Sequence, residues 1–180
     1  IDEKNLWAHR ETTGFVPMHF NELARYMEYI LRSGVTDRPT SLELGCGAGS
    51  WALIAASLGF PAYGIDINPE LVDAAKEIRD KAREKGIIDP AVPCEFAVGN
   101  YFTNQYLFDR REFIMERYEF KGAWKKSGEP YKELGIDIKD AGIIYTWPWP
   151  QEVKIMGDFL AREVAESAII ILPYYNEQMS

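Results

Sequence analysis

The spacing of apolar residues along the chain alternates between helical and extended patterns. Over residues 19–32 apolar side chains recur every three or four positions, and Gly34 ends the run, which predicts a helix. Five short apolar segments are typical of buried strands, and they cover residues 41–45, 62–67, 94–100, 141–147 and 167–175. Further helical patterns follow the first, second and fourth of these segments, at residues 50–59, 68–86 and 151–166.

Strands that alternate with helices predict βαβ crossovers. The expected fold class is therefore α/β, a doubly wound, mostly parallel sheet with helices on both faces. A chain of 180 residues suits one domain with a sizeable core, so we expect a single domain over 1–180, with 1–34 as an N-terminal helical segment.

Two of the predicted helices have clear apolar faces. In the helix over 68–86, Asn68 is the expected cap, Pro69 lies in the first turn and Gly86 follows the end. Its predicted buried face consists of Leu71, Ala75, Ile78 and Ala82. The helix over 151–166 is predicted to bury Val153, Met156, Leu160 and Val164.

Residues 101–140 interrupt the alternation. This segment is at least twice as long as one crossover helix requires, and it mixes many aromatic residues with many charges. We interpret it as an insertion between the third and fourth strands. It forms either a lid or partner surface, or an extra helix packed on the core.

The charge and cysteine content narrow the possible partners and location. The 28 acidic and 20 basic residues give a net charge of −8, which opposes non-specific binding to nucleic acid backbones. No apolar run approaches the ~20 residues of a membrane span. Cys46 lies in a glycine loop and Cys94 in a predicted buried strand, so we expect no disulfide and a cytoplasmic location. His9 and His19 lack partners at metal-ligand spacing, and no metal site is predicted.

Three alternating glycines, Gly45, Gly47 and Gly49, follow the first strand. Glycine lets a ligand approach the backbone closely, and the next helix offers free N–H groups where α/β sheets bind ligands. The second strand ends in Asp66, and an acid at this place can accept both hydroxyls of a ribose. The loop and the acid together predict nucleoside binding.

The loop spacing separates classes of nucleotide-binding protein. The dinucleotide fingerprint has its third glycine three positions after the second, whereas here it comes two positions after and Ser50 follows it. The spacing argues against a nicotinamide-binding oxidoreductase, which stays as a less favoured alternative. No Lys followed by Ser or Thr is present in the loop, so it is not a P-loop.

Four segments in order resemble the class I S-adenosylmethionine-dependent methyltransferases, whose core is Rossmann-like. They are "LELGCGAGS", "GIDIN", "FAVGN" and "AGIIYTWPWP", and the resemblance runs from about residue 41 to 172. It implies S-adenosylmethionine as cofactor and direct transfer of its methyl group to an unidentified acceptor. A protein side chain or a small molecule is favoured over nucleic acid because the chain is acidic.

The resemblance also implies roles for individual residues. The backbone of Gly45, Cys46 and Gly47, within a loop completed by Gly49, would lie along the methionine part of the cofactor. The remaining cofactor contacts would be Glu43 at the amino group, Asp66 at the ribose hydroxyls, Ile67 on the adenine and Asn100 at the adenine amino group. Phe15 either closes over the cofactor or packs before the first helix.

The methyl-transfer end would be lined by residues after the fourth strand, namely Thr146, Trp147, Pro148 and Trp149. The two tryptophans either form an aromatic rim for the acceptor or pack against the insertion. Methyl transfer needs alignment above all, and a general base is optional.

Two comparisons with the family bear on the acceptor. The family's sheet usually continues into a sixth and a seventh strand, whereas this chain ends soon after the fifth, as either a minimal or a truncated core. The opening "GFVPMHFNELARYMEYIL" is similar to that of small archaeal protein-lysine methyltransferases.

The alternative to an enzyme is a non-catalytic S-adenosylmethionine-binding module or partner subunit.

Overall fold

Five parallel strands form the centre of the molecule. The computed structural model describes residues 20–36, 38–117, 128–149 and 152–172. The strands are β1 (Ser41–Leu44), β2 (Ala62–Asp66), β3 (Cys94–Val98), β4 (Ile143–Thr146) and β5 (Ile169–Ile171). Their order across the sheet is β3-β2-β1-β4-β5, and every pair is parallel. The predicted α/β class is therefore confirmed.

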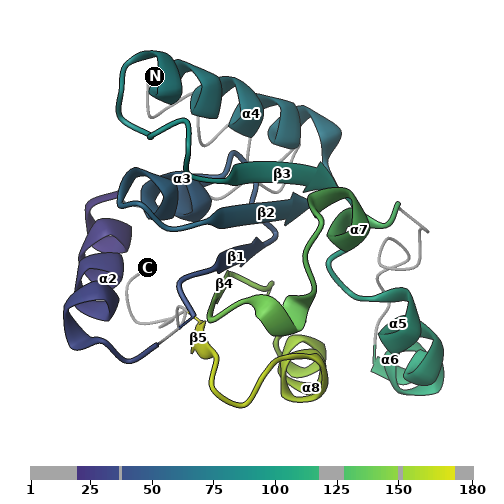
Figure 1. Ribbon diagram of the computed structural model, residues 1–180. Coiled ribbons are helices and arrows are strands. Elements are labelled where there is room, and N and C mark those ends of the chain that lie inside the picture. Colours follow the sequence, from purple (N-terminus) through teal and green to yellow (C-terminus); the bar gives the residue numbers. More distant parts are fainter. Residues whose placement is uncertain (1–19, 37, 118–127, 150–151, 173–180) are drawn as a thin grey trace, which may run out of the picture.

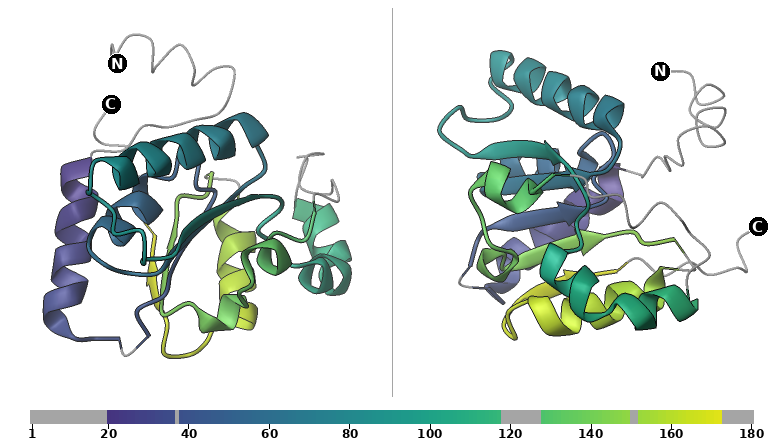
Figure 2. Two further views of the ribbon diagram at one scale, coloured as in Figure 1. Left: turned by 45° about the horizontal axis from the view of Figure 1, so that its top comes forward. Right: turned by 90° about the vertical axis from the view of Figure 1, so that its right-hand side faces the viewer.

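Helices cover both faces of this sheet (Figure 1). One face carries α2 (Phe20–Ser33), α3 (Ser50–Ser57) and α4 (Pro69–Glu84). The other carries α5 (Asn104–Asp109), α6 (Arg111–Arg117), the 3₁₀ turn η1 (Ile138–Asp140) and α8 (Val153–Glu163). The short α7 (Pro130–Leu134) packs against β3. Figure 2 shows α4 and α8 on opposite sides of the strands.

Alternation of side chains along the strands divides the core into two clusters. In β1, Ser41 and Glu43 face α3, whereas Leu42 and Leu44 belong to the cluster under α8. The first cluster centres on Trp51, whose indole donates to the Ser41 hydroxyl at 2.8 Å and stacks on Tyr145 at 4.6 Å. The doubly wound arrangement thus rests on two separate cores that share one sheet.

Most predicted elements are present, but several details differ. The Asn68 side chain caps α4 by accepting the Glu70 N–H at 3.0 Å, as predicted. The predicted apolar faces of two helices are partly wrong. In α4 Val72 is fully buried while Ile78 is 45% exposed, and in α8 Val153 is 51% exposed. The residues that α8 buries are Ile155, Met156, Phe159 and Leu160.

The strands are also shorter than the sequence patterns indicate. The fourth covers Ile143–Thr146 rather than 141–147, and the fifth is described only over Ile169–Ile171. Residues 173–175 of the expected fifth strand lie outside the described part. Ala141 and Gly142 precede β4 and are buried. Gly142 passes the backbone of Arg38 so closely that a Cβ there would collide with the Arg38 carbonyl oxygen.

The described part of the 101–140 insertion packs on the second core. Its buried side chains are Phe102, Tyr106, Ile114 and Ile138. The Tyr106 ring makes an edge contact with Phe159 of α8, and its hydroxyl lies 3.0 Å from the Asp158 carboxylate. Arg110 also pairs with Asp158, at 2.9 Å. The helices of the insertion are therefore fixed to α8 as well as to the sheet.

Candidate functional site

The carboxyl ends of the parallel strands meet at one edge of the sheet. In Figure 1 the arrowheads of β2 and β3 point toward α7 at this edge. Strand β1 lies between β2 and β4, so the strand order reverses at β1. Open α/β sheets bind ligands outside the carboxyl ends at such a reversal. The loop after β1 is therefore the first place to look for a site.

Three glycines in this loop adopt left-handed backbone angles. Their φ values are +75° at Gly45, +52° at Gly47 and +78° at Gly49. Such angles strain any residue that carries a Cβ, which accounts for the glycines. The N–H groups of Gly45 and Cys46 both donate to the Ile65 carbonyl, at 2.9 and 3.0 Å, so the loop is fixed to β2. Gly45 itself is exposed at the edge.

Gly49 is also confined by its neighbours. A Cβ there would lie 2.6 Å from the Phe96 ring and 3.1 Å from Cβ of Ala75. The glycine therefore permits α4 and β3 to approach the start of α3. The neighbouring Cys46 is buried, and burial raises the pKa of its thiol. Its sulfur packs against Gly64, so the residue fills space beneath the loop.

Glu43 is buried on β1 and bonds to the start of α3. Its two carboxylate oxygens accept the N–H groups of Trp51 at 3.3 Å and Ala52 at 3.0 Å. Burial raises the pKa of this carboxyl to about 8, although the two N–H donors oppose the shift. The side chain is only 4% exposed. Helix capping therefore explains the acid on this strand, and its expected contact with a cofactor amino group stays a prediction.

Asp66 lies at the end of β2, beside the loop. One carboxylate oxygen accepts the Gly47 N–H and the other the Asn68 N–H, both at 2.8 Å. Partial burial raises its pKa, and the N–H groups of Asn68, Gly47 and Ile67 oppose the shift. A carboxylate has about four acceptor sites, so these three donors leave it an acceptor site for a ligand. Such a site suits a hydroxyl of a ribose.

The other predicted cofactor residues are distributed around this edge. Ile67 follows Asp66 and is 48% exposed, which leaves its side chain free to cover an apolar ring. Asn100 is two residues beyond β3, and its side-chain oxygen accepts the Phe102 N–H at 3.0 Å. Phe15 lies outside the described residues.

The residues after β4 reach the same edge. Thr146 pairs with Leu44 of β1 and is buried, and its hydroxyl has no hydrogen-bond partner in the described part of the chain. Trp147 is half-buried, Pro148 is buried and Trp149 is 40% exposed. The predicted methyl-transfer residues therefore adjoin the glycine loop, and Trp149 is the one most open to solvent.

Two further residues at this edge escaped the sequence analysis. A Cβ at Gly45 would lie 3.8 Å from Cε1 of Tyr101, so the tyrosine ring lies beside the first loop glycine. The Tyr101 hydroxyl lies 3.4 Å from the Glu152 carboxylate, which also accepts the Trp149 N–H at 3.2 Å. Both residues follow the carboxyl end of a predicted strand, at β3 and β4, and this position in the sequence could have indicated them.

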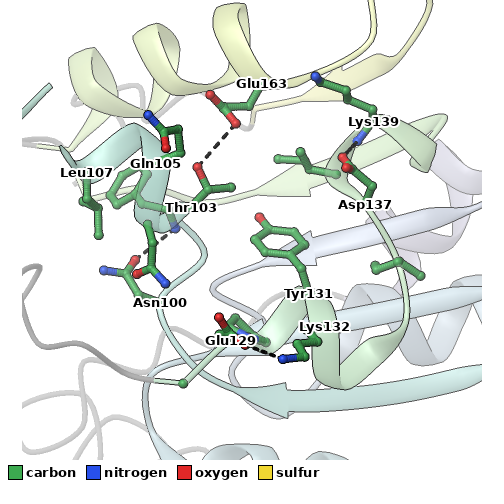
Figure 3. A pocket seen from close by; sticks show the side chains of 16 residues that line it. Asn100, Thr103, Gln105, Leu107, Glu129, Tyr131, Lys132, Asp137, Lys139 and Glu163 are labelled. Atoms are coloured by element: carbon green, nitrogen blue, oxygen red, sulfur yellow. Dashed lines mark hydrogen bonds and ion pairs between the residues drawn. The ribbon is translucent and has the colours of Figure 1, made fainter. Parts of the chain in front are cut away.

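A cavity of about 350 Å³ lies to one side of this edge (Figure 3). It is enclosed by α5, α7, η1 and the end of α8, and its lining combines Lys132 and Lys139 with Glu129, Asp137 and Glu163. Tyr131 lies within it and donates to the Tyr101 carbonyl at 2.6 Å. Asn100 is its only lining residue among those predicted from the sequence, so the cavity and the glycine loop are separate features.

Two features are absent from the described residues, 20–36, 38–117, 128–149 and 152–172. No group of three His, Cys, Asp or Glu side chains there is arranged to hold a metal ion. No helix among them is long and apolar enough to cross a membrane.

Comparisons with known proteins find similarity to methyltransferases. Residues 36–113 match a family model described as a methyltransferase domain. A ribosomal protein L11 methyltransferase from Paraburkholderia phytofirmans is 34% identical over 84 residues, which are 43% of this chain and 28% of that protein. The chain therefore spans little more than a quarter of the curated relatives that it matches.

Solved structures share the fold at low sequence identity. An RNA methyltransferase from Salinibacter ruber, in complex with S-adenosylhomocysteine, is 20% identical, with a TM-score of 0.52 over 83% of this chain and 72% of that one. An S-adenosylmethionine-dependent methyltransferase from Clostridium acetobutylicum is 12% identical, with a TM-score of 0.50 over 95% of this chain and 57% of that one. These likenesses establish the fold.

Proposed function

We propose that this chain is a class I S-adenosylmethionine-dependent methyltransferase, which binds S-adenosylmethionine at the carboxyl edge of its sheet and methylates an acceptor there. The observation that carries the proposal is the arrangement of Asp66 and the glycine loop. Asp66 is fixed by backbone N–H groups, keeps an acceptor site for a ligand, and is bonded directly to Gly47 of the loop, whose first glycine is exposed.

Each predicted residue then has a role that fits its place. Gly45, Cys46 and Gly47 present backbone to the methionine part, and Asp66 accepts the ribose hydroxyls. The exposed Ile67 packs on the adenine, and Asn100 accepts from its amino group. Glu43 acts on the cofactor through the helix that it caps, or through the acceptor sites that the Trp51 and Ala52 N–H groups leave.

The protein's contribution to the reaction is alignment and exclusion of water. The cofactor supplies an electrophilic methyl group on a sulfonium when it is bound. Residues that hold the acceptor in line with this group can lower the activation free energy by ~7–11 kcal/mol without any acid or base. Trp147, Pro148 and Trp149 lie where such an acceptor would enter.

Charge and cysteine chemistry support the remaining proposals. A net charge of −8 favours a protein side chain or a small molecule over nucleic acid as acceptor. Both cysteines are free and buried, which supports a reducing, cytoplasmic location. The match covers only 28% of the ribosomal protein L11 methyltransferase, so it does not indicate the acceptor of this chain.

Calorimetric titration of the protein with S-adenosylmethionine, before and after Asp66→Ala, tests the proposal. A hydrogen bond to a charged group, worth ~1.5–3 kcal/mol, is lost, so we expect affinity to fall at least ~10-fold. Asp73→Ala is the matched control, because Asp73 is an exposed acid on α4 and should leave affinity unchanged.

Three results separate the proposal from its alternatives. Unchanged affinity in Asp66→Ala would show that the ribose is not bound here. Binding of NAD with no binding of S-adenosylmethionine would favour the oxidoreductase. Tight binding of S-adenosylmethionine, without methylation of any amine, hydroxyl or thiol acceptor, would favour the non-catalytic module.

A further inference from the structure

Glu152 is a half-buried carboxylate at the methyl-transfer end of the site. It lies at the start of α8, six residues beyond the end of β4. Its carboxylate accepts the Trp149 N–H at 3.2 Å and lies 3.4 Å from the Tyr101 hydroxyl. Its own N–H donates to the Trp149 carbonyl at 2.7 Å, which closes the turn and fixes the side chain toward the edge.

Among the described residues, the contacts of this carboxylate are with neutral groups, and no Lys, Arg or His side chain lies within 4.0 Å of it. The half-buried Asp66 and Glu163 likewise have no cationic partner there, whereas Glu95 and Asp158 are paired with arginines. Burial of a carboxylate is costly unless a cation or several donors compensate it. Among the described residues, the charge of Glu152 is therefore met only by the Trp149 N–H and the Tyr101 hydroxyl, so a positively charged ligand can still pair with it.

Tyr101 connects this charge to the proposed cofactor site. Its ring lies beside Gly45, the exposed first glycine of the loop, while its hydroxyl lies 3.4 Å from the Glu152 carboxylate. One phenol ring therefore spans the distance from the loop backbone to the carboxylate. A group that pairs with Glu152 is held next to the methionine end of a ligand on the loop.

The neighbouring side chains suit a cation as well. Trp149 is 40% exposed and precedes Glu152 by one turn, and Trp147 is half-buried after β4. Tryptophan faces attract alkylammonium groups, and the attraction reaches ~2 kcal/mol when the cation is desolvated. Among the described residues, carboxylate and indole at this edge both favour a positive ligand.

We infer that Glu152 binds the methyl acceptor and that the acceptor is a primary alkylamine, which arrives as an alkylammonium ion. This inference rests on the proposed methyltransferase function. The ammonium gives one proton to the Glu152 carboxylate, and the neutral amine keeps a free lone pair on nitrogen for methylation. Burial raises the pKa of Glu152, which makes it a better proton acceptor than an exposed carboxylate.

The test measures binding of a small amine to the intact protein, apart from turnover. Protein saturated with S-adenosylhomocysteine is titrated with n-butylammonium, and the indole N–H signals of Trp147 and Trp149 are followed by NMR. We expect both signals to shift, and we expect n-butanol, which has the same length without the charge, to bind at least tenfold more weakly.

Glu152→Gln and Glu163→Gln form a matched pair of variants. Both glutamates are half-buried at opposite ends of α8, and both lie near a hydroxyl, that of Tyr101 or Thr103. We expect Glu152→Gln to weaken n-butylammonium binding at least tenfold while S-adenosylhomocysteine still binds. Glu163→Gln should change neither.

The outcomes separate this inference from the proposed function. If S-adenosylhomocysteine itself fails to bind, the proposed function is wrong. If it binds but n-butylammonium does not, or binds equally well to Glu152→Gln, the amine inference is overturned. A titration with Nα-acetyl-lysine methylamide then identifies the source of the amine. Tighter binding than n-butylammonium indicates a protein lysine, and weaker binding indicates a free small amine.

Discussion

At the scale of single residues, glycines with left-handed backbones differ in how much space surrounds them. Gly49 has φ +78° and its missing Cβ would collide with the Phe96 ring at 2.6 Å. Gly59 has φ +91° but no atom within 4 Å of that position. The two residues therefore separate the cost of backbone strain from the cost of crowding.

We predict that Gly49→Ala destabilises the protein much more than Gly59→Ala. Left-handed strain costs ~1–2 kcal/mol at either position, and crowding against Phe96 and Ala75 adds ~1–3 kcal/mol at Gly49. Urea unfolding of the two variants measures the difference directly. Equal losses of stability would mean that the helix α4 can move away from the loop freely.

Residue identity allows more specific predictions for the cofactor side of the proposed site than for the acceptor side. The alternating glycines and Asp66 are recognisable because few other functions require those residues at those spacings. Tyr101 and Glu152 carry no such pattern. They meet only because segments that follow two different strands fold over the same edge.

At the scale of elements, one buried carboxylate joins β1 to α3. Glu43 accepts the N–H groups at the start of α3, where the helix dipole favours negative charge. Burial nevertheless raises the pKa of Glu43 from 4.5 to about 8. The folded state therefore binds the proton more tightly than the unfolded state does. Because of Glu43, the free energy of unfolding falls as the pH rises from 4.5 to about 8.

We predict a pH-dependent difference between the wild-type protein and Glu43→Gln. Between pH 5 and pH 8 the wild type should lose stability relative to the variant, by on the order of 1 kcal/mol per pH unit at most, since the glutamine cannot ionise. Urea midpoints at several pH values measure this difference. Parallel curves would show that Glu43 stays ionised throughout, held by the helix N-terminus.

Element types were predictable, whereas the faces that helices bury were less so. The sequence of α4 offers overlapping apolar stripes, since Leu71, Val72, Ala75 and Ile78 all lie within three turns. The structure buries Val72 and Ala75 because α4 approaches the glycine loop at Ala75, where Gly49 leaves room. A contact between segments far apart in the sequence therefore determines which face of α4 is buried. Helical periodicity alone cannot predict that face.

At the scale of the whole molecule, the strand order places the site. Alternating strands and helices predict a parallel sheet, but they leave the order β3-β2-β1-β4-β5 open. That order brings β4 beside β1, so Thr146 lies opposite Leu44 and the residues after β4 reach the glycine loop. The same edge is flanked by a cavity of about 350 Å³, which offers a competing place for a ligand.

Two-dimensional ¹H–¹⁵N NMR of the protein with S-adenosylhomocysteine tests most directly where the cofactor binds. We expect the largest chemical-shift changes at the amides of Gly45, Gly47 and Gly49. The amides of Gly59 and Gly86, which follow the other ends of α3 and α4, should not shift. Large changes at Gly128 in the cavity lining, with none in the loop, would contradict it.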